Sequence, residues 1–252
     1  MTDQTRSIAD ISPGKAARVA GVLYLVITVA AIVAHMYVPT RLIVPGDAAA
    51  TVANIASSGS LFRAAIGGEF VVLLSEIVLS VILYSLFRTV NRTISLTAAV
   101  SRLTMTAIHG INLLNYFFVL LLIGEPDYVA VFTKAQVDAL VSLFLEAHSY
   151  GFTIGIAFLT IHVFALGYLI VKSGYVPRVL GVFFIVAGFG YLFDSFALLF
   201  LANYETTPVY FALPIALAEI AFPLWLLVKG VNVQAQAKGL SLASPQVEGS
   251  GV

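Results

Sequence analysis

Six long runs of apolar residues divide the chain, and connections with charged residues, glycine or proline separate them. A helix needs about 20 mostly apolar residues to cross the hydrocarbon core of a bilayer. The runs that reach this length cover residues 17–38, 61–87, 96–123, 148–171, 179–202 and 208–228. Such a segment must be helical, because lipid offers no partner for its backbone groups. The pattern therefore predicts an all-α integral membrane bundle of six transmembrane helices.

The connections predict two short external helices. Asp47 follows the turn sequence VPG and can cap a helix over about 47–58. Residues 136–147 place apolar side chains on one helical face and are expected to form a second short helix before the fourth span. The predicted organisation is a cytoplasmic lead at 1–16, a transmembrane domain at 17–231 and a disordered tail rich in Gln, Ser, Gly and Ala at 232–252.

Basic residues predict the orientation of the bundle. Arg88 and Arg92, then Lys172 and Arg178, and finally Lys229 fall on the same side as the basic N-terminal lead. The opposite connections are richer in acidic residues. Because basic loops stay on the cytoplasmic side, both termini are predicted to be cytoplasmic. The first apolar run is too long for a signal-peptide core and is interpreted as an uncleaved span.

The composition agrees with a membrane protein and excludes several functions. Hydrophobic residues make up 60% of the 252 residues and charged residues 10%, whereas soluble domains have about 25% charged residues. Basic and acidic residues number 13 each, so no basic field is available for nucleic acid. Cysteine is absent, which excludes disulfides, thiolate nucleophiles and cysteine-ligated clusters. The expected partner is the lipid bilayer, with no nucleic acid.

Four stretches of the chain resemble a known family. They are RVAGVLYLVITVAAIVA, LIVPGDAAATVANIASSGSLFR, ALGYLIVKSGYVPRVLGVFFIVAGFGYL and ALAEIAFPLWLLVKGV. Together they resemble the bacterial multi-pass membrane family called domain of unknown function 4386, over about residues 18–231. The resemblance implies a multi-pass protein of the bacterial cytoplasmic (inner) membrane. This family has no established activity, so the resemblance implies no site residues.

Ionisable residues within the spans are candidate functional residues, because polar groups are costly in lipid. Glu69 and Glu76 are seven residues apart, so they share a helix face about 10.5 Å apart along the axis. Arg102, His109 and Tyr116 repeat at the same spacing in the third span. The residues expected to line a polar centre are Glu69, Glu76, Arg102, His109, Asn112, Tyr116, His162, Asp194 and Glu219.

Charge counting shows that the embedded acids outnumber their cations. Four carboxylates lie within the spans, whereas Arg102 is the only deep arginine. An unpaired carboxylate costs several kcal/mol in a low-dielectric medium, so some of these acids should be neutral, bind a cation or face water. Pro223 cannot donate to the Glu219 carbonyl four residues earlier, which leaves an acceptor free beside that carboxyl. Gly151 and Gly155 favour close approach of another helix.

One hypothesis for the function is transport of a small solute, linked to protons, through a centre lined by carboxylates and histidines. Such groups are typical of proton relays in membranes. The six spans contain no clear inverted repeat, so a homo-oligomer is a candidate assembly. Nucleophilic catalysis has no support, because the chain lacks a G-x-S-x-G motif. A phosphate-binding glycine loop is also absent, which disfavours ATP-driven work.

Two alternatives stay open. The first is a membrane-embedded haem or metal-binding protein, which could be an enzyme. His148 and His162 are fourteen residues apart, a spacing that resembles b-type cytochromes, with His35 and His109 as opposite ligands. The metal-ligand candidates are His109, His148, His162 and Glu76, although HExxH is absent and the sequence requires no cofactor. The second alternative is a non-catalytic component that binds lipid or a partner protein and whose carboxyls tie helices together.

Overall fold

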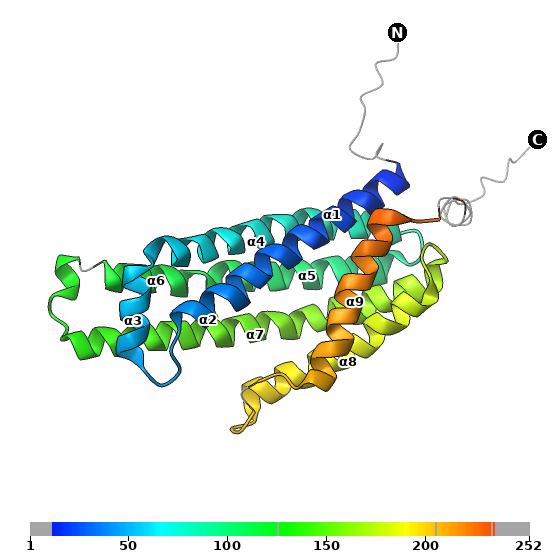
Figure 1. Cartoon of the computed structure of the whole chain (residues 1–252). Coiled ribbons are helices and arrows are strands. Elements are labelled where there is room, and N and C mark those ends of the chain that lie inside the picture. The colour runs from blue at the N-terminus through cyan, green and yellow to red at the C-terminus, as the bar shows by residue number, and fades with distance from the viewer. Residues whose placement is uncertain (1–11, 125, 205, 233, 235–252) are drawn as a thin grey trace, which may run out of the picture.

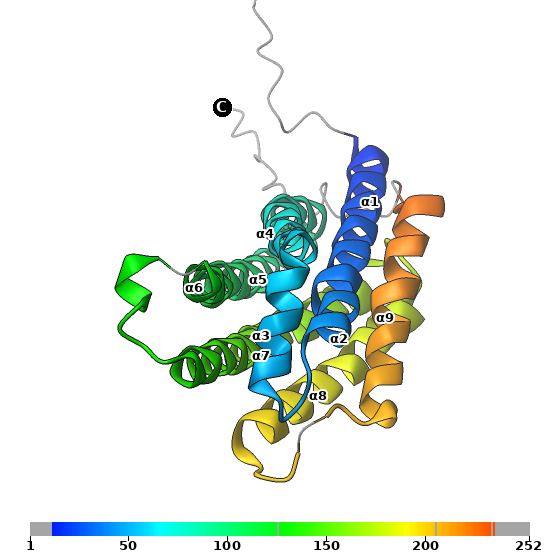
Figure 2. The ribbon, with the colours of Figure 1, turned by 60° about the vertical axis from the view of Figure 1, so that its left-hand side comes forward.

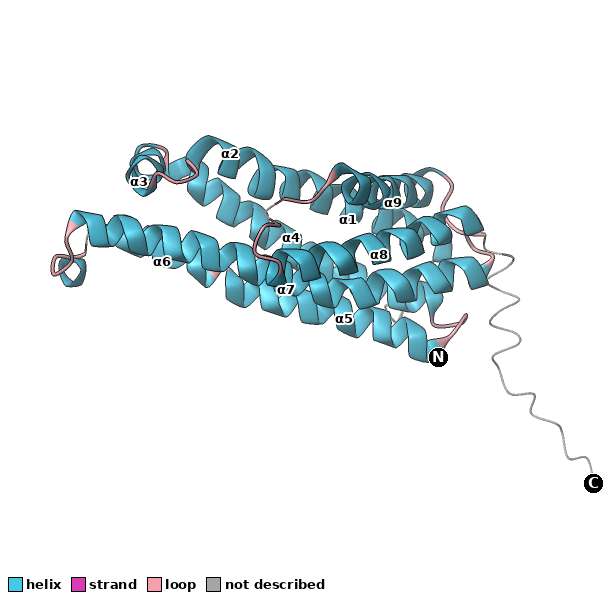
Figure 3. Cartoon of the chain, turned by 90° about the horizontal axis from the view of Figure 1, so that it is seen from below, coloured by secondary structure: helices cyan, strands magenta, loops and turns pink. Residues whose placement is uncertain are grey.

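The computed structural model describes residues 12–124, 126–204, 206–232 and 234. This part of the chain is 85% helical. It contains no strand, as Figure 3 shows. Six of its helical segments are long and apolar enough to cross a membrane. The predicted all-α bundle of six spans is therefore confirmed. Most of the predicted lead and of the predicted tail lies outside the described residues.

The helices of the described chain follow one another with short connections (Figure 1). In order they are α1 (Pro13–Ala31), the π-helix η2 (Ile32–Tyr37), α2 (Val38–Leu42), α3 (Ala48–Ser57), α4 (Gly59–Phe87), α5 (Arg92–Asn112), α6 (Leu114–Ile123), the 3-10 helix η3 (Asp127–Val129), α7 (Lys134–Ser173), α8 (Arg178–Phe200) and α9 (Val209–Val228). The first span combines α1, η2 and α2, and the third combines α5 and α6.

The six spans form a closed ring. α1 packs against α4 and α9, α9 against α8, α8 against α7, α7 against α5, and α5 against α4 (Figure 2). The start of α1 and the end of α9 lie at the same end of the bundle, which we call the proximal end. The opposite end, with α3 and the connection between α6 and α7, is the distal end. The cytoplasmic location of the proximal end stays a prediction.

A glycine brings the first and last spans together and so closes the ring. A Cβ atom at Gly21 would lie 2.8 Å from the Leu227 backbone nitrogen and 2.9 Å from the Pro223 carbonyl oxygen. Only glycine lets the α1 backbone approach α9 this closely, as is common between membrane helices. At the proximal end, the Asn232 backbone nitrogen donates a hydrogen bond to the Tyr175 carbonyl at 2.9 Å. Both contacts hold the end of α9 against the rest of the bundle.

The structure treats the two predicted external helices differently. Asp47 caps α3 as predicted, since its carboxylate accepts a hydrogen bond from the Ala50 nitrogen at 2.8 Å. Residues 136–147, in contrast, form no separate helix and are the first turns of α7. Thr133 and Gln136 start α7 with a capping box, and no proline follows before Ser173 to interrupt it.

The length of α7 makes the distal end project from the membrane. A 40-residue helix is about 60 Å long at 1.5 Å per residue. The hydrocarbon core is about 30 Å thick, and a tilt of up to about 40° cannot absorb the difference. Because the apolar run of this span covers residues 148–171, the first turns of α7 are expected at the level of the lipid headgroups or beyond. They pack against α3 and α6 (Figure 1).

Candidate functional site

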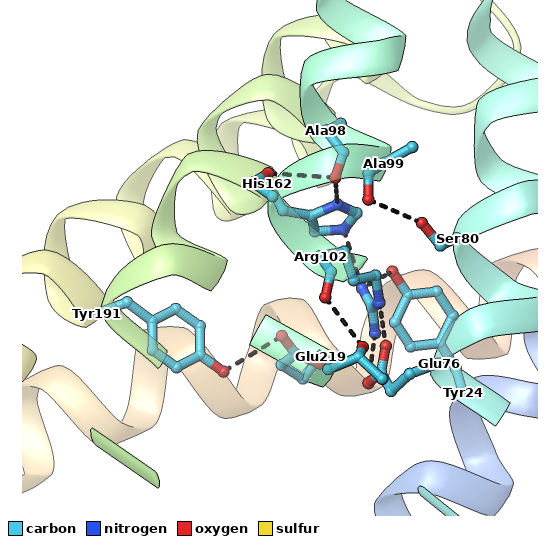
Figure 4. A network of polar contacts seen from close by, with 11 residues as sticks. Tyr24, Glu76, Ser80, Ala98, Ala99, Arg102, His162, Tyr191 and Glu219 are labelled. Atoms are coloured by element: carbon cyan, nitrogen blue, oxygen red, sulfur yellow. Dashed lines mark hydrogen bonds and ion pairs between the residues drawn. The ribbon is translucent and has the colours of Figure 1, made fainter. Parts of the chain in front are cut away.

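A buried polar cluster occupies the inside of the ring, centred on Arg102 of α5 (Figure 4). Its Nε and Nη2 donate to the two carboxylate oxygens of Glu76 on α4, with Nη2 2.9 Å from Oε1. Its Nη1 donates to the Tyr24 hydroxyl on α1 at 3.2 Å and contacts His162 Nε2 on α7 at 2.9 Å. All four side chains are buried. One guanidinium thus joins four spans.

The contact with Arg102 fixes the protonation of the His162 ring. Arginine has only donors, so His162 Nε2 must accept the hydrogen bond from Nη1. The ring proton is then on Nδ1, which donates to the Ala98 carbonyl at 2.9 Å. His162 is therefore a neutral imidazole in this arrangement, with both nitrogens engaged.

These contacts bear on the metal and haem alternatives. His162 would have to give up one of its two hydrogen bonds before it could bind a metal or haem iron. Glu76 already accepts from Arg102 through both oxygens. Among the residues that the structure describes, no three His, Cys, Asp or Glu side chains form a group that could hold a metal ion.

Glu219 lies beside this cluster without a cation of its own. Figure 4 shows it on α9, between Tyr191 and the Arg102–Glu76 pair. The Tyr191 hydroxyl on α8 donates to Glu219 Oε1 at 3.2 Å. Within the described chain, no ion pair joins Glu219 to a lysine, arginine or histidine. Among the residues that the structure describes, the centre therefore combines one carboxylate paired with Arg102 and one carboxyl whose hydrogen bond comes from a hydroxyl.

A second polar cluster, which we call the distal cluster, lies closer to the distal end. His35 of the π-helix η2 has its Nε2 2.9 Å from Glu69 Oε1 on α4. This oxygen is buried, and the described residues form no hydrogen bond to it, so the contact is an ion pair only when the His35 ring carries both protons. Phe152 lies between His35 and His109, with ring centroids 4.4 and 4.8 Å away. Segments of π-helix often mark functional sites, and here one carries the histidine.

The side chains of His109 and Asn112 fill the space beside Gly155 and Gly151 of α7. His109 Nε2 donates to the Phe152 carbonyl at 3.0 Å, and Asn112 Nδ2 donates to the His148 carbonyl at 2.8 Å. A Cβ atom at Gly155 would lie 2.1 Å from His109 Nε2, and one at Gly151 would lie 2.0 Å from Asn112 Oδ1. The glycines thus admit polar side chains from α5 to the backbone of α7.

Comparisons with known proteins give the family of the chain. The family described as "Domain of unknown function (DUF4386)" matches residues 19–230. The chain belongs to this family. The match spans both clusters of this DUF4386 protein and confirms the resemblance stated from the sequence. An archaeal protein from Archaeoglobus fulgidus, described as "Uncharacterized protein", is 28% identical over 165 residues, which cover 65% of this chain and 82% of the relative. No solved structure matches.

The DUF4386 chain does not bring all of its predicted site residues together. Glu76, Arg102 and His162 meet at the centre, with Glu219 beside them. Glu69, His109, Asn112 and Tyr116 join the distal cluster, where Tyr116 stacks on His148 with ring centroids 3.7 Å apart. Asp194 belongs to neither group. It accepts hydrogen bonds from Tyr204 at 2.6 Å and Thr207 at 2.8 Å, in the connection between α8 and α9.

The contacts of Asp194 indicate a structural role. Burial, together with the hydrogen bond and the charge of Asp194, raises the pKa of the Tyr204 hydroxyl, so this group stays a donor at physiological pH. Both carboxylate oxygens of Asp194 are therefore satisfied by hydroxyl donors of the same connection.

Sequence reasoning did not predict two residues of the clusters, Tyr24 and Phe152. Tyr24 was detectable in principle, because a tyrosine inside an apolar span needs a hydrogen-bond partner for its hydroxyl. Phe152 carried no such signal, since its part in the distal cluster comes from its ring faces and its backbone carbonyl.

Proposed function

We propose that this multi-pass membrane protein carries out proton-linked transport of a small solute, with Glu219 as its proton-binding carboxyl. The observation that supports the proposal is the position of Glu219. It lies beside the Arg102–Glu76 pair, and its recorded partner is the Tyr191 hydroxyl rather than a cation. A negative charge left at this depth without a counter-ion would cost several kcal/mol. A proton at Glu219 removes that charge.

Competition for Arg102 provides a mechanism for coupling. Glu76 holds Arg102 through both carboxylate oxygens, and we assign this arrangement to the state in which Glu219 is protonated. When Glu219 releases its proton, its carboxylate competes with Glu76 for the same guanidinium. Because Glu76, Arg102 and Glu219 lie on α4, α5 and α9, a change of partner shifts three spans of the ring relative to one another. Transport by alternating access needs such a two-state element.

The distal cluster supplies a second proton-binding position along the same helix. Glu69 and Glu76 are seven residues apart on α4, which corresponds to about 10.5 Å along the axis. Glu69 has the His35 ring as its neighbour and an oxygen without a hydrogen bond. A proton that enters near His35 and Glu69 would still have about 10.5 Å to cover along α4 before it reached the depth of Glu76, and this distance requires intervening water molecules or polar side chains.

The test is proton flux in liposomes that contain the purified protein and a pH-sensitive dye. Under an imposed pH gradient and with the potential clamped, wild-type protein is expected to carry protons faster than protein-free liposomes. Glu219→Gln keeps the size and the acceptor for Tyr191 but cannot bind or release a proton, so its flux should fall to the protein-free rate. Asp194→Asn is the matched control, because this carboxylate is held by the α8–α9 connection.

The control variant is expected to retain the wild-type rate. Equal flux through wild type and Glu219→Gln would overturn the role of Glu219. Wild-type flux no faster than that of protein-free liposomes, over a range of pH gradients and candidate co-solutes, would overturn proton-linked transport itself.

A further inference from the structure

A pocket of about 560 Å³ opens at the distal end, away from both polar clusters. Its walls come from α3, the end of α6, the connection through η3 and the first turns of α7, and most are apolar, including Val52, Leu122, Val129 and Val137. This volume falls in the range of small-molecule sites, and apolar walls with a few polar groups are typical of them.

One carboxylate stands among these apolar walls. Asp138 of α7 lines the pocket and is 8% exposed. Its cation within the described chain is Lys134, whose Nζ lies 2.9 and 3.2 Å from the two carboxylate oxygens. The Lys134 side chain is 77% exposed and sits one turn away on the same helix. A pair of this i,i+4 type on one helix contributes only about 0.3–0.5 kcal/mol, so the solvent-exposed ammonium holds Asp138 weakly. The buried carboxylate can therefore take a different cation.

We propose that this pocket binds a hydrophobic cation, such as a bulky amine or a quaternary ion, and recognises it through Asp138. The apolar part of the ligand packs against α3, α6 and α7, while its positive charge replaces the Lys134 ammonium at Asp138. An anionic ligand fits less well, because the buried group is the carboxylate and the lysine extends into solvent.

The charges inside the bundle favour the same class of ligand. The described spans place Glu69, Glu76 and Glu219 around the ring interior, against Arg102 as the fixed cation. That a hydrophobic cation is also the substrate of the transporter rests on the function proposed above. In that case each cation is exchanged for a proton that binds at Glu219. Binding at the pocket can be tested without transport.

The experiment measures binding of tetraphenylphosphonium to the detergent-purified full chain by equilibrium dialysis against empty micelles. Saturable binding is expected for wild type, and Asp138→Asn should weaken it about tenfold, equivalent to about 1.4 kcal/mol. Lys134→Gln removes the competing ammonium and should strengthen binding. Ala56→Phe places a ring in the pocket and should abolish binding, whereas Ser57→Phe, the next residue of α3 but not a lining one, should leave it unchanged.

Tetraphenylborate, of similar shape and opposite charge, is the matched probe. The proposal is overturned if tetraphenylphosphonium shows no saturable binding. It is also overturned if tetraphenylborate binds as tightly as tetraphenylphosphonium and Lys134→Gln weakens the binding of tetraphenylborate. It is also overturned if Ala56→Phe and Ser57→Phe bind alike. Glu219→Gln is expected to bind tetraphenylphosphonium as wild type does. Absence of proton flux in wild type that still binds the cation would overturn the transport proposal alone. Proton flux in wild type that binds no cation would overturn the pocket proposal alone.

Discussion

Arg102 contacts three other spans through three different nitrogens, and this division depends on the planar guanidinium. Nε and Nη2 form a two-pronged pair with Glu76, while Nη1 is left for Tyr24 and His162. The Arg102 guanidinium carbon also lies 5.0 Å from the centre of the Tyr24 ring. A lysine would supply a single point charge and could not form this set of contacts. Arg102 therefore holds the centre of the ring in one arrangement.

At the same scale, Gly155→Ala is expected to destabilise the protein. The added Cβ would lie 2.1 Å from His109 Nε2, so the ring must leave the Phe152 carbonyl or α7 must move. Overpacking of this kind costs about 1–3 kcal/mol. Gly67→Ala in α4 is the control, because a Cβ there meets nothing within 4 Å. Both variants gain the same helix propensity, so the difference between them isolates the clash.

Thermal unfolding in detergent, followed by the fluorescence of the single tryptophan Trp225, measures both variants. Gly155→Ala should unfold at a clearly lower temperature than wild type, and Gly67→Ala at the same or a higher one. Equal midpoints for the two variants would contradict the close contact between α5 and α7.

The sequence predicted the faces of the site residues better than their partners. A separation of seven residues along a helix placed Glu69 on the same face as Glu76, and Arg102 on the same face as His109. All four side chains are buried. Charge counting indicated that Arg102 could neutralise only some of the acids. Charge counting could not show whether Arg102 pairs with Glu76 or with Glu219, because its partner depends on how α4, α5 and α9 are rotated in the ring. The depth of a residue follows from its own helix, whereas its contacts depend on neighbouring helices.

At the scale of the elements, the connection between α8 and α9 shows that an acidic residue in an apolar span can have a structural role. Asp194 lies near the end of α8 and receives hydroxyl donors from Tyr204 and Thr207. From the sequence alone Asp194 resembled Glu219, since both are single acids in apolar runs. The difference lies in the connection, which folds back onto Asp194.

Asp194→Ala should therefore loosen this connection. The change removes both acceptors, and hydrogen bonds to charged groups contribute about 1.5–3 kcal/mol each. Hydrogen exchange of the backbone amides at 201–204 and 206–207 is expected to accelerate, while exchange at the proximal connection around Tyr175 stays as in wild type. Unchanged exchange beside α8 would show that Asp194 does not hold the connection.

For the whole molecule, the closed ring has a consequence for assembly. Contact of α1 with α9 completes the ring within one chain, and both polar clusters are enclosed by its own spans. A second copy is thus not needed to complete either cluster, and the predicted homo-oligomer stays a prediction. The number of spans and their apolar length were predictable from the sequence. The order of neighbours in the ring was not, because the apolar face of one span could pack against the apolar face of any other.

The orientation of the ring in the membrane is the last prediction. Arg88, Arg92, Lys172, Arg178 and Lys229 all lie near the proximal end, so the positive-inside rule places this end in the cytoplasm. The distal pocket would then face outward, which suits capture of a cation from outside the cell. The absence of cysteine lets a single introduced cysteine report its side of the membrane.

Val131→Cys marks the distal connection, where the valine is 80% exposed, and Thr93→Cys marks an exposed position at the proximal start of α5. A membrane-impermeant maleimide should label Val131→Cys in intact cells and Thr93→Cys only after the cells are opened. The reverse pattern would invert the orientation and place the distal pocket in the cytoplasm, where a cation site would load from inside. Labelling of both variants in intact cells would indicate two orientations of the chain, and the basic residues would then not determine its topology.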